Sequence, residues 1–209
     1  MLDFRKGVDI LAAVGGVSTI AEARQLFARR LDPEHLARLG TITNEEALLK
    51  IANAIAMCDP ERVFIHTGSE ADCAAVRALS LEKGEEAKLA MPGHTIHFDL
   101  PEDQGRMVDQ TFDIANPDEQ VSSLAKKELR DESHAYVREH MRGIMRGMTM
   151  FVGFCSRGPV GARAAIPAIE ISRSTYVLHS AELLYRNCFA DFDAEIARRG
   201  EFFTNVHAQ

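Results

Sequence analysis

Three side chains that can bind a metal ion lie close together near the middle of the chain: His94, His97 and Asp99. Imidazole nitrogen and carboxylate oxygen are common ligands of zinc and other divalent ions. Residues two apart in a strand share a face, so His97 and Asp99 lie together, whereas His94 reaches that face only if the segment turns. Two ligands do not complete a metal site. We therefore expect no metal to be bound by this chain, and the role of the cluster stays open.

A second group of functional side chains recurs at four-residue spacing: His134, Arg138, Arg142 and Arg146. On a helix predicted over 123–146, this spacing places all four on one face. Such a row can contact a phosphate-bearing ligand or an acidic surface of another domain. It is also typical of a solvated helix face whose basic end suits the helix C-terminus. The sequence leaves both interpretations open.

Other motifs for catalysis or anion binding are weak. Gly68-Ser69 could hold an anion on free helix N–H groups, but a turn followed by an ordinary N-cap explains the same residues. The 209 residues contain neither a Gly-x-Ser-x-Gly elbow nor a Walker-type phosphate loop. The cysteines show no Cys-x-x-Cys pair, so we expect reduced thiols in the core: Cys58, Cys73, Cys155 and Cys188. By motif alone the chain holds no complete active site.

The elements that must position these residues alternate between strand and helix patterns. β-rich or apolar runs predict strands at 63–67, 150–154, 168–171 and 203–207, with two or three short strands between 87 and 115. Apolar residues at helical spacing predict helices near 20–31, 44–57, 69–83, 123–146 and 174–188. The first two follow capping-box pairs, Thr19 with Glu22 and Thr43 with Glu46, and an acidic turn is expected at 191–195. The order predicts an α/β fold, a mixed β-sheet flanked by helices.

The composition, 46% hydrophobic and 26% charged, is that of an ordinary globular protein. No run approaches about 18 consecutive apolar residues and the first residues lack a secretory signal, so we predict no membrane partner and a cytoplasmic location. A net charge of −7 argues against a nucleic-acid partner, because binding a polyanion requires a basic surface. The length suits one domain spanning residues 1–209.

A strand of the Thr-Met-Phe-Val type, a Gly-Pro-x-Gly loop and a Ser-x-Tyr-Val helix follow one another at 149–152, 158–161 and 174–177, ahead of a segment at 203–207. This order resembles the N-terminal domain of GTP-dependent phosphoenolpyruvate carboxykinase. Two earlier stretches, 58–70 and 105–111, also fit that family. Arg157 and Ala162-Arg163 depart from its usual residues around the Gly-Pro loop, which indicates a divergent branch.

The resemblance implies a fold like the phosphoenolpyruvate carboxykinase N-terminal domain. It also implies an enzyme that converts oxaloacetate and GTP, or a pyrophosphate-type phosphoryl partner, to phosphoenolpyruvate and carbon dioxide with manganese or magnesium. Gly105, Arg106 and Thr111 match the family's Gly/Ala-Arg-x-x-x-x-Thr motif, so the resemblance assigns Arg106 to the substrate carboxylate. A planar guanidinium suits this role because it offers paired donors to a carboxylate.

In that family the phosphate-binding loop, the metal ligands and the nucleotide pocket lie further along the chain than the segment matching 203–207. We therefore expect a substrate-binding N-terminal domain that has no catalytic residues of its own, lacks the C-terminal nucleotide- and metal-binding domain, and is inactive alone. Its expected partners are phosphoenolpyruvate or oxaloacetate and that C-terminal catalytic domain. The alternative is a non-catalytic module of the same fold that binds a carboxylate or another protein. The phosphoryl partner and the oligomeric state stay open.

Overall fold

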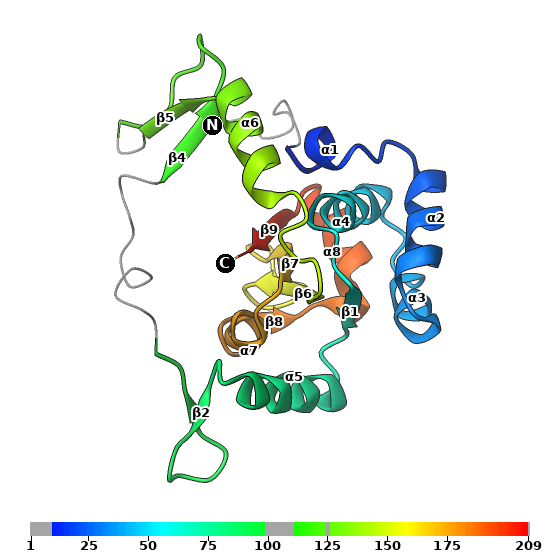
Figure 1. Ribbon diagram of the computed structural model, residues 1–209, viewed down its shortest axis with the longest axis vertical. Coiled ribbons are helices and arrows are strands. Elements are labelled where there is room, and N and C mark those ends of the chain that lie inside the picture. Colours follow the sequence, from blue (N-terminus) through cyan, green and yellow to red (C-terminus); the bar gives the residue numbers. More distant parts are fainter. Residues whose placement is uncertain (1–9, 99–110, 124–125, 209) are drawn as a thin grey trace.

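The protein is described by a computed structural model that covers residues 10–98, 111–123 and 126–208. Figure 1 shows a central sheet with helices around it and a smaller lobe formed by β4, β5 and α6. The sheet contains β1 (Arg62–His66), β6 (Thr149–Arg157), β7 (Ile166–Ser172), β8 (Arg186–Asn187) and β9 (Phe203–His207). The predicted α/β fold with a mixed sheet is confirmed.

Two different strands, β1 and β8, pair with successive parts of the same edge of β6, and the break between them lies at the middle of β6. β1 runs parallel to the first half of β6, while β7 runs antiparallel along its other side and pairs in parallel with β9. The short strand β8 pairs with β6 further along, on the side where β1 lies. His66, which ends β1, is opposite Gly153, and Asn187 of β8 is opposite Cys155. The ends of β1 and β8 therefore meet beside the middle of β6.

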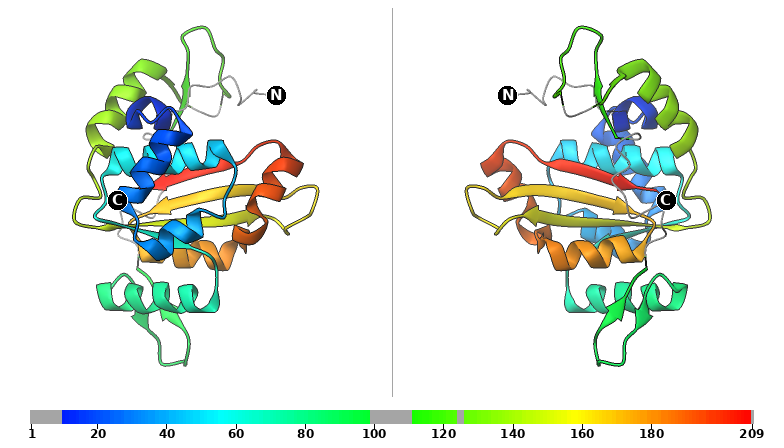
Figure 2. Two further views of the ribbon diagram at one scale, coloured as in Figure 1. Left: turned by 90° about the vertical axis from the view of Figure 1, so that its right-hand side faces the viewer. Right: turned by 90° about the vertical axis from the view of Figure 1, so that its left-hand side faces the viewer.

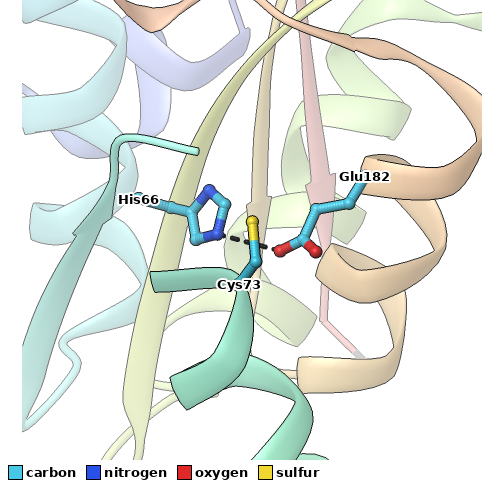
Figure 3. A group of neighbouring side chains, drawn as sticks. All are labelled: His66, Cys73 and Glu182. Carbon is cyan, nitrogen blue, oxygen red and sulfur yellow. Dashed lines mark ion pairs between the residues drawn. The ribbon is translucent and has the colours of Figure 1, made fainter. Parts of the chain in front are cut away.

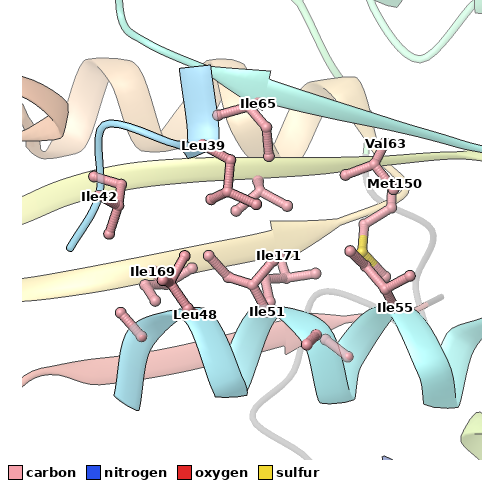
Figure 4. Close-up of a cluster of buried hydrophobic side chains, with 14 of the residues drawn as sticks. Leu39, Ile42, Leu48, Ile51, Ile55, Val63, Ile65, Met150, Ile169 and Ile171 are labelled. Atoms are coloured by element: carbon pink, nitrogen blue, oxygen red, sulfur yellow. The ribbon is translucent and has the colours of Figure 1, made fainter. Parts of the chain in front are cut away.

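Alternation along the strands gives the sheet two different faces. One face is covered by α4 (Glu45–Cys58) and α8 (Phe192–Arg199), with α1 (Ile10–Gly15), α2 (Ile20–Arg30) and α3 (Pro33–Leu39) packed beyond or beside them. It holds the larger core, where α4 packs on the sheet as Figure 4 shows, through Leu48, Ile51, Ile55, Val63, Ile65, Met150, Ile169 and Ile171. Every one of these side chains is almost fully buried, so this layer supplies most of the hydrophobic stabilisation.

The opposite face is covered by α7 (Thr175–Leu184), with α5 (Glu70–Lys83) packed against α7 (Figure 2). Its apolar cluster is small, formed by Val76, Phe151 and Leu178. The remaining inward positions of the strands on this face include polar side chains, because His66 follows the core residue Ile65 and Glu170 lies between the core residues Ile169 and Ile171. Polar groups buried in such a layer require partners.

The helix predicted over 123–146 is wrong. Residues Lys126–Leu129 form β5, which pairs in parallel with β4 (Phe112–Ala115), and α6 covers only Arg130–Met141. After α6 the chain turns at Gly143, which has a φ of 68°, and its N–H donates to the Met57 carbonyl oxygen. Met145 N–H donates to the Cys58 carbonyl oxygen in the same way. These bonds to the last carbonyl groups of α4 replace the helical bonds that the spacing predicted.

Smaller differences between the predicted and observed elements have local causes. Asp32 caps a short helix that the sequence had not predicted, α3, with Pro33 at its first position. Asn44 caps α4 in place of the predicted Thr43, and the acidic segment at 191–195 begins α8 instead of forming only a turn. The expected short strands are present as β2 (Ala87–Lys88), β3 (Thr95–Ile96) and β4. None of the helices described is long and apolar enough to span a bilayer.

Candidate functional site

The predicted substrate residue Arg106 lies outside the described residues, together with Gly105 and Asp99. Thr111, the other residue of the carboxylate motif, is exposed and directly precedes β4. The role of Arg106 therefore stays a prediction.

His94 and His97 each contact a different backbone carbonyl group. The Nδ1 atom of His94 lies 3.2 Å from the Pro92 carbonyl oxygen, and that of His97 lies 2.5 Å from the Glu85 carbonyl oxygen. The His97 ring also stacks on Tyr176, with ring centroids 3.5 Å apart. Within the described ranges, neither histidine belongs to a group of three or more side chains close enough to share an ion.

The predicted cationic row is split by the end of α6. His134 and Arg138 lie on that helix, whereas Arg142 directly follows its last residue and Arg146 lies in the following turns. Arg146 forms an ion pair with Asp59, with Nε and Oδ2 2.9 Å apart. The three arginines nevertheless line one shallow hollow of 480 Å³, so the turn after α6 keeps them together without a common helix.

Gly68-Ser69 has the local role of a turn and an N-cap. The Ser69 hydroxyl accepts a hydrogen bond from the Asp72 N–H at the start of α5. Gly68 has a φ of 74°, and a Cβ atom there would lie 2.2 Å from the side-chain amide of Asn187. Only glycine suits this position, because the turn requires positive φ and lets β8 approach β1.

A basic hollow of 690 Å³ opens beside the turn that precedes α7. Its charged residues include three cations, Arg62, Lys83 and Arg173, and one carboxylate, Glu85. The Glu85 side chain accepts hydrogen bonds from the Ser174 hydroxyl and the Tyr176 N–H. Burial raises the pKa of Glu85, but these hydrogen bonds and the charge of Lys83 outweigh it and lower that pKa overall. The balance of charge favours an anionic ligand in this hollow.

A second hollow, of 240 Å³, lies at the break between β1 and β8 and is covered by α5 and α7. Its wall brings together side chains that no linear motif connects. His66 comes from the end of β1, Cys73 from the first turn of α5, and Glu182 from the last turn of α7. Figure 3 shows the three side chains pointing toward one another. Their ligand atoms all lie within 4.8 Å of each other.

The polar atoms of this group contact one another. His66 Nε2 lies 2.9 Å from Glu182 Oε1, and the two side chains are 6% and 17% exposed. The two groups form an ion pair when His66 is protonated, although their orientation does not form a hydrogen bond. The Cys73 thiol also interacts with the Glu182 carboxylate, so the lone pairs of all three side chains are directed at one small region.

The cysteine of the group is a protonated thiol in the absence of a cation. Burial, followed by the negative charge of Glu182, raises the pKa of Cys73 to about 11. Cys58, Cys155 and Cys188 also have raised pKa values of about 12, mainly because they are buried. All four cysteines are free, as predicted, but Cys73 is only half-buried and does not belong to the core.

A neighbouring carboxylate on the same hollow is fully paired. Glu170 of β7 is buried and lies 2.6 Å from Asn205 Nδ2, 3.2 Å from His207 Nε2 and 3.8 Å from an Arg157 guanidinium nitrogen. Asn205 and His207 both belong to β9, so these contacts stabilise the pairing of the edge strand β9 with β7. Glu170 therefore has a structural role that the group at His66 lacks.

No pattern in the sequence points to this group. His66 lies within a predicted strand, Cys73 is one of the predicted core thiols, and Glu182 belongs to no motif. The only local signal is that His66 and Cys73 flank a strand–helix junction. Glu182 reaches them through the packing of α7 on α5, which spacing along the chain does not reveal.

Comparisons with known proteins agree on one family. A family model described as the phosphoenolpyruvate carboxykinase N-terminal domain matches residues 50–209. The chain is similar to the phosphoenolpyruvate carboxykinase [GTP] of Saccharolobus solfataricus, with 34% identity over 82% of this chain and 27% of the relative. It is also similar to the proteins of that name from Thermococcus kodakarensis, with 34% identity over 89% and 30%, and Sulfurisphaera tokodaii, with 38% over 79% and 26%. The matched region thus spans less than a third of each of these relatives.

Proposed function

Because the chain belongs to the phosphoenolpyruvate carboxykinase N-terminal domain family, we propose that it is the substrate-binding part of a carboxykinase. In this proposal the complete enzyme converts oxaloacetate and GTP to phosphoenolpyruvate, carbon dioxide and GDP. The observation that carries it is the family match over residues 50–209, a range that includes Arg106. The names of the relatives support GTP as the phosphoryl partner, whereas no residue of this chain distinguishes GTP from pyrophosphate.

The part of the reaction assigned to this chain is recognition of the substrate carboxylate. Arg106 would donate two parallel hydrogen bonds to that carboxylate, which fixes the orientation of the substrate. The basic hollow supports an anionic ligand on this side of the domain, since Arg62, Lys83 and Arg173 surround it. Phe98, the last residue described before the segment that contains Arg106, also lines this hollow.

Metal and nucleotide would be bound by residues outside this chain. Manganese or magnesium would neutralise charge on the transferred phosphoryl group. The chain by itself would therefore bind its substrate weakly. A charge-assisted contact contributes about 1.5 to 3 kcal/mol, which does not offset an association cost of at least about 4 kcal/mol. We expect a dissociation constant in the millimolar range or weaker, and no carboxykinase activity from the 209 residues alone.

Titration of the 209-residue chain with oxaloacetate and with phosphoenolpyruvate, followed by amide chemical shifts in NMR spectra, tests this proposal. We expect fast-exchange shifts that disappear in Arg106→Ala and are only slightly restored in Arg106→Lys, because an ammonium lacks the paired donors. Arg142→Ala, an exposed arginine after α6, is the matched control and should bind like the unmodified chain.

If Arg106→Ala binds as well as Arg142→Ala, the assignment of Arg106 is wrong although the family holds. Absence of any shift with either compound would favour a non-catalytic module that binds another protein. Incorporation of bicarbonate into oxaloacetate by the pure chain, with manganese, phosphoenolpyruvate and GDP supplied, would contradict the proposal that metal and nucleotide are bound by residues outside this chain.

A further inference from the structure

We propose that His66, Cys73 and Glu182 form a binding site for zinc or a similar borderline divalent ion. The three side chains supply one nitrogen, one sulfur and one oxygen ligand from three different elements, β1, α5 and α7. Their ligand atoms are already within 4.8 Å of one another. Ligands of a tetrahedral zinc ion, at about 2.0 to 2.3 Å from the metal, lie about 3.3 to 3.8 Å from one another, so small side-chain movements would bring these three atoms into that range.

The contact between His66 and Glu182 leaves both groups able to bind a cation. His66 is 5% exposed, and its Nε2 atom and Glu182 Oε1 lie 2.9 Å apart in an orientation that does not form a hydrogen bond. A cation bound by both atoms would accept a lone pair from each of them.

The donor set selects the class of ion. A thiolate and an imidazole favour zinc, cobalt(II) and related ions, whereas magnesium, calcium and manganese prefer oxygen ligands. On binding, the Cys73 thiol loses its proton to solvent and its sulfur becomes a thiolate ligand. One thiolate and one carboxylate then balance the two positive charges of the ion, and His66 contributes a neutral nitrogen. The buried site is thus neutral when it is occupied.

Three protein ligands leave one tetrahedral position open. That position faces a hollow of 240 Å³ whose wall includes Arg186 and Asn187 of β8. A water molecule or a small anion can occupy it, and the guanidinium of Arg186 on the same wall favours the anion. The ion would also link α5 and α7 to the edge of the sheet at the break between β1 and β8. This site is independent of the proposed carboxylate recognition by Arg106.

Cobalt(II) titration of the untagged 209-residue chain, after removal of metals with a chelator, tests the site directly. We expect one cobalt per chain, a thiolate-to-cobalt charge-transfer band in the near ultraviolet, and displacement of that band by zinc. Changes in outer-shell partners typically cost about 10- to 100-fold in metal affinity, so loss of the thiolate ligand in Cys73→Ser should cost at least about 100-fold. The charge-transfer band should be absent from this variant.

Cys155→Ser is the matched control, because Cys155 lines the same hollow but does not belong to the group. It should keep both the band and the affinity. Thermal unfolding in the presence of chelator shows whether each variant folds. If Cys73→Ser does not fold, Glu182→Gln provides the second test and should weaken zinc binding while the band remains. A band that persists in Cys73→Ser, or unchanged zinc affinity in Glu182→Gln, would overturn the site.

Discussion

Helix α7 takes part in two buried contacts between a histidine and a glutamate, and the two differ in how completely their polar atoms are paired. In the first, His179 Nδ1 lies 2.9 and 3.0 Å from the two carboxylate oxygens of Glu86. Its Nε2 lies 3.2 Å from a guanidinium nitrogen of Arg77, and the Thr95 hydroxyl donates to Glu86. In the second, Glu182 approaches His66 one helical turn further along, without forming a hydrogen bond.

The difference separates a structural contact from a candidate binding site. The Glu86–His179 pair joins the chain just before the β2–β3 hairpin to α7, and Arg77 extends the contact to α5. Both of its side chains are less than a tenth exposed, and all of the ring nitrogens and carboxylate oxygens have partners. In the Glu182–His66 contact, His66 is buried to the same degree but Glu182 is 17% exposed, and the two facing atoms do not form a hydrogen bond. The two pairs therefore differ less in burial than in how completely their polar atoms are hydrogen-bonded.

Removing the acidic partner from each pair should produce the largest contrast. Glu86→Ala would leave His179 and Thr95 without their acceptor in a buried position, and breaking such a pair costs about 3 to 5 kcal/mol. Glu182→Ala removes a partly exposed carboxylate whose contact with His66 is not a hydrogen bond, so without metal it should cost less, about 1 kcal/mol. Urea unfolding of the chelator-treated chain, followed by circular dichroism, measures both free energies of unfolding.

Equal losses in the two alanine variants would show that the pairs do not differ as the structure indicates. Added zinc sharpens the comparison, because it should stabilise the Glu86→Ala variant and the unmodified chain but have little effect on Glu182→Ala.

The stability of the fold at acidic pH should also depend on Glu86, the carboxylate of the fully hydrogen-bonded pair. Burial raises the pKa of Glu86, but hydrogen bonds from Thr95 and His179 are among the contacts that outweigh it, so the folded-state pKa lies below the ordinary value of 4.5. A carboxyl with a lower pKa in the folded state stabilises the fold above its unfolded pKa and loses that contribution as pH falls through the folded pKa. The penalty for Glu86→Gln should therefore be complete at pH 7 and shrink below about pH 4.5.

Urea unfolding of the unmodified chain and Glu86→Gln at a series of pH values from 7 to about 3 measures this change. A penalty that stays constant over the range would mean that ionisation of Glu86 does not contribute to the stability of the pair.

The sheet was largely predictable from the sequence, whereas the two pairs were not. Strands such as β6 and β7 carry long apolar runs, and the capping box at Thr19 and Glu22 is formed as predicted at the start of α2. Those signals are local. The helix predicted over 123–146 failed because bonds to the end of α4 stop α6 at Met141, and such tertiary contacts leave no trace in the spacing.

The site depends even more on tertiary packing. His66 and Cys73 are close in the sequence, but each also fits an ordinary strand–helix unit. Glu182 joins them only because α7 packs on α5, and the orientation of its contact with His66 cannot be predicted from the sequence. The predicted carboxylate motif came from family resemblance, and Arg106 lies outside the described residues, so the structure adds nothing to that assignment.

The smallest expected effect concerns the reactivity of the half-buried cysteine beside Glu182. Thiolate is the reactive form, and after burial the charge of Glu182 is the largest contribution to the raised pKa of Cys73, about 11. Glu182→Gln removes that charge, so the pKa should fall and alkylation by iodoacetamide at pH 8 should become faster. A decrease of up to one pKa unit corresponds to an increase of up to about tenfold in thiolate, so we expect a gain of about two- to tenfold.

Mass spectrometry of the peptide that contains Cys73, sampled over time in the presence of chelator, measures this rate. Glu82→Gln, which changes an exposed carboxylate on the same helix, is the control and should leave the rate unchanged. Zinc should slow alkylation of the unmodified chain, because a metal-bound sulfur is not free to react, and should slow Glu182→Gln less. Equal rates in Glu182→Gln and Glu82→Gln would show that Glu182 does not act on the thiol, and the distinction between the two pairs would then rest on geometry alone.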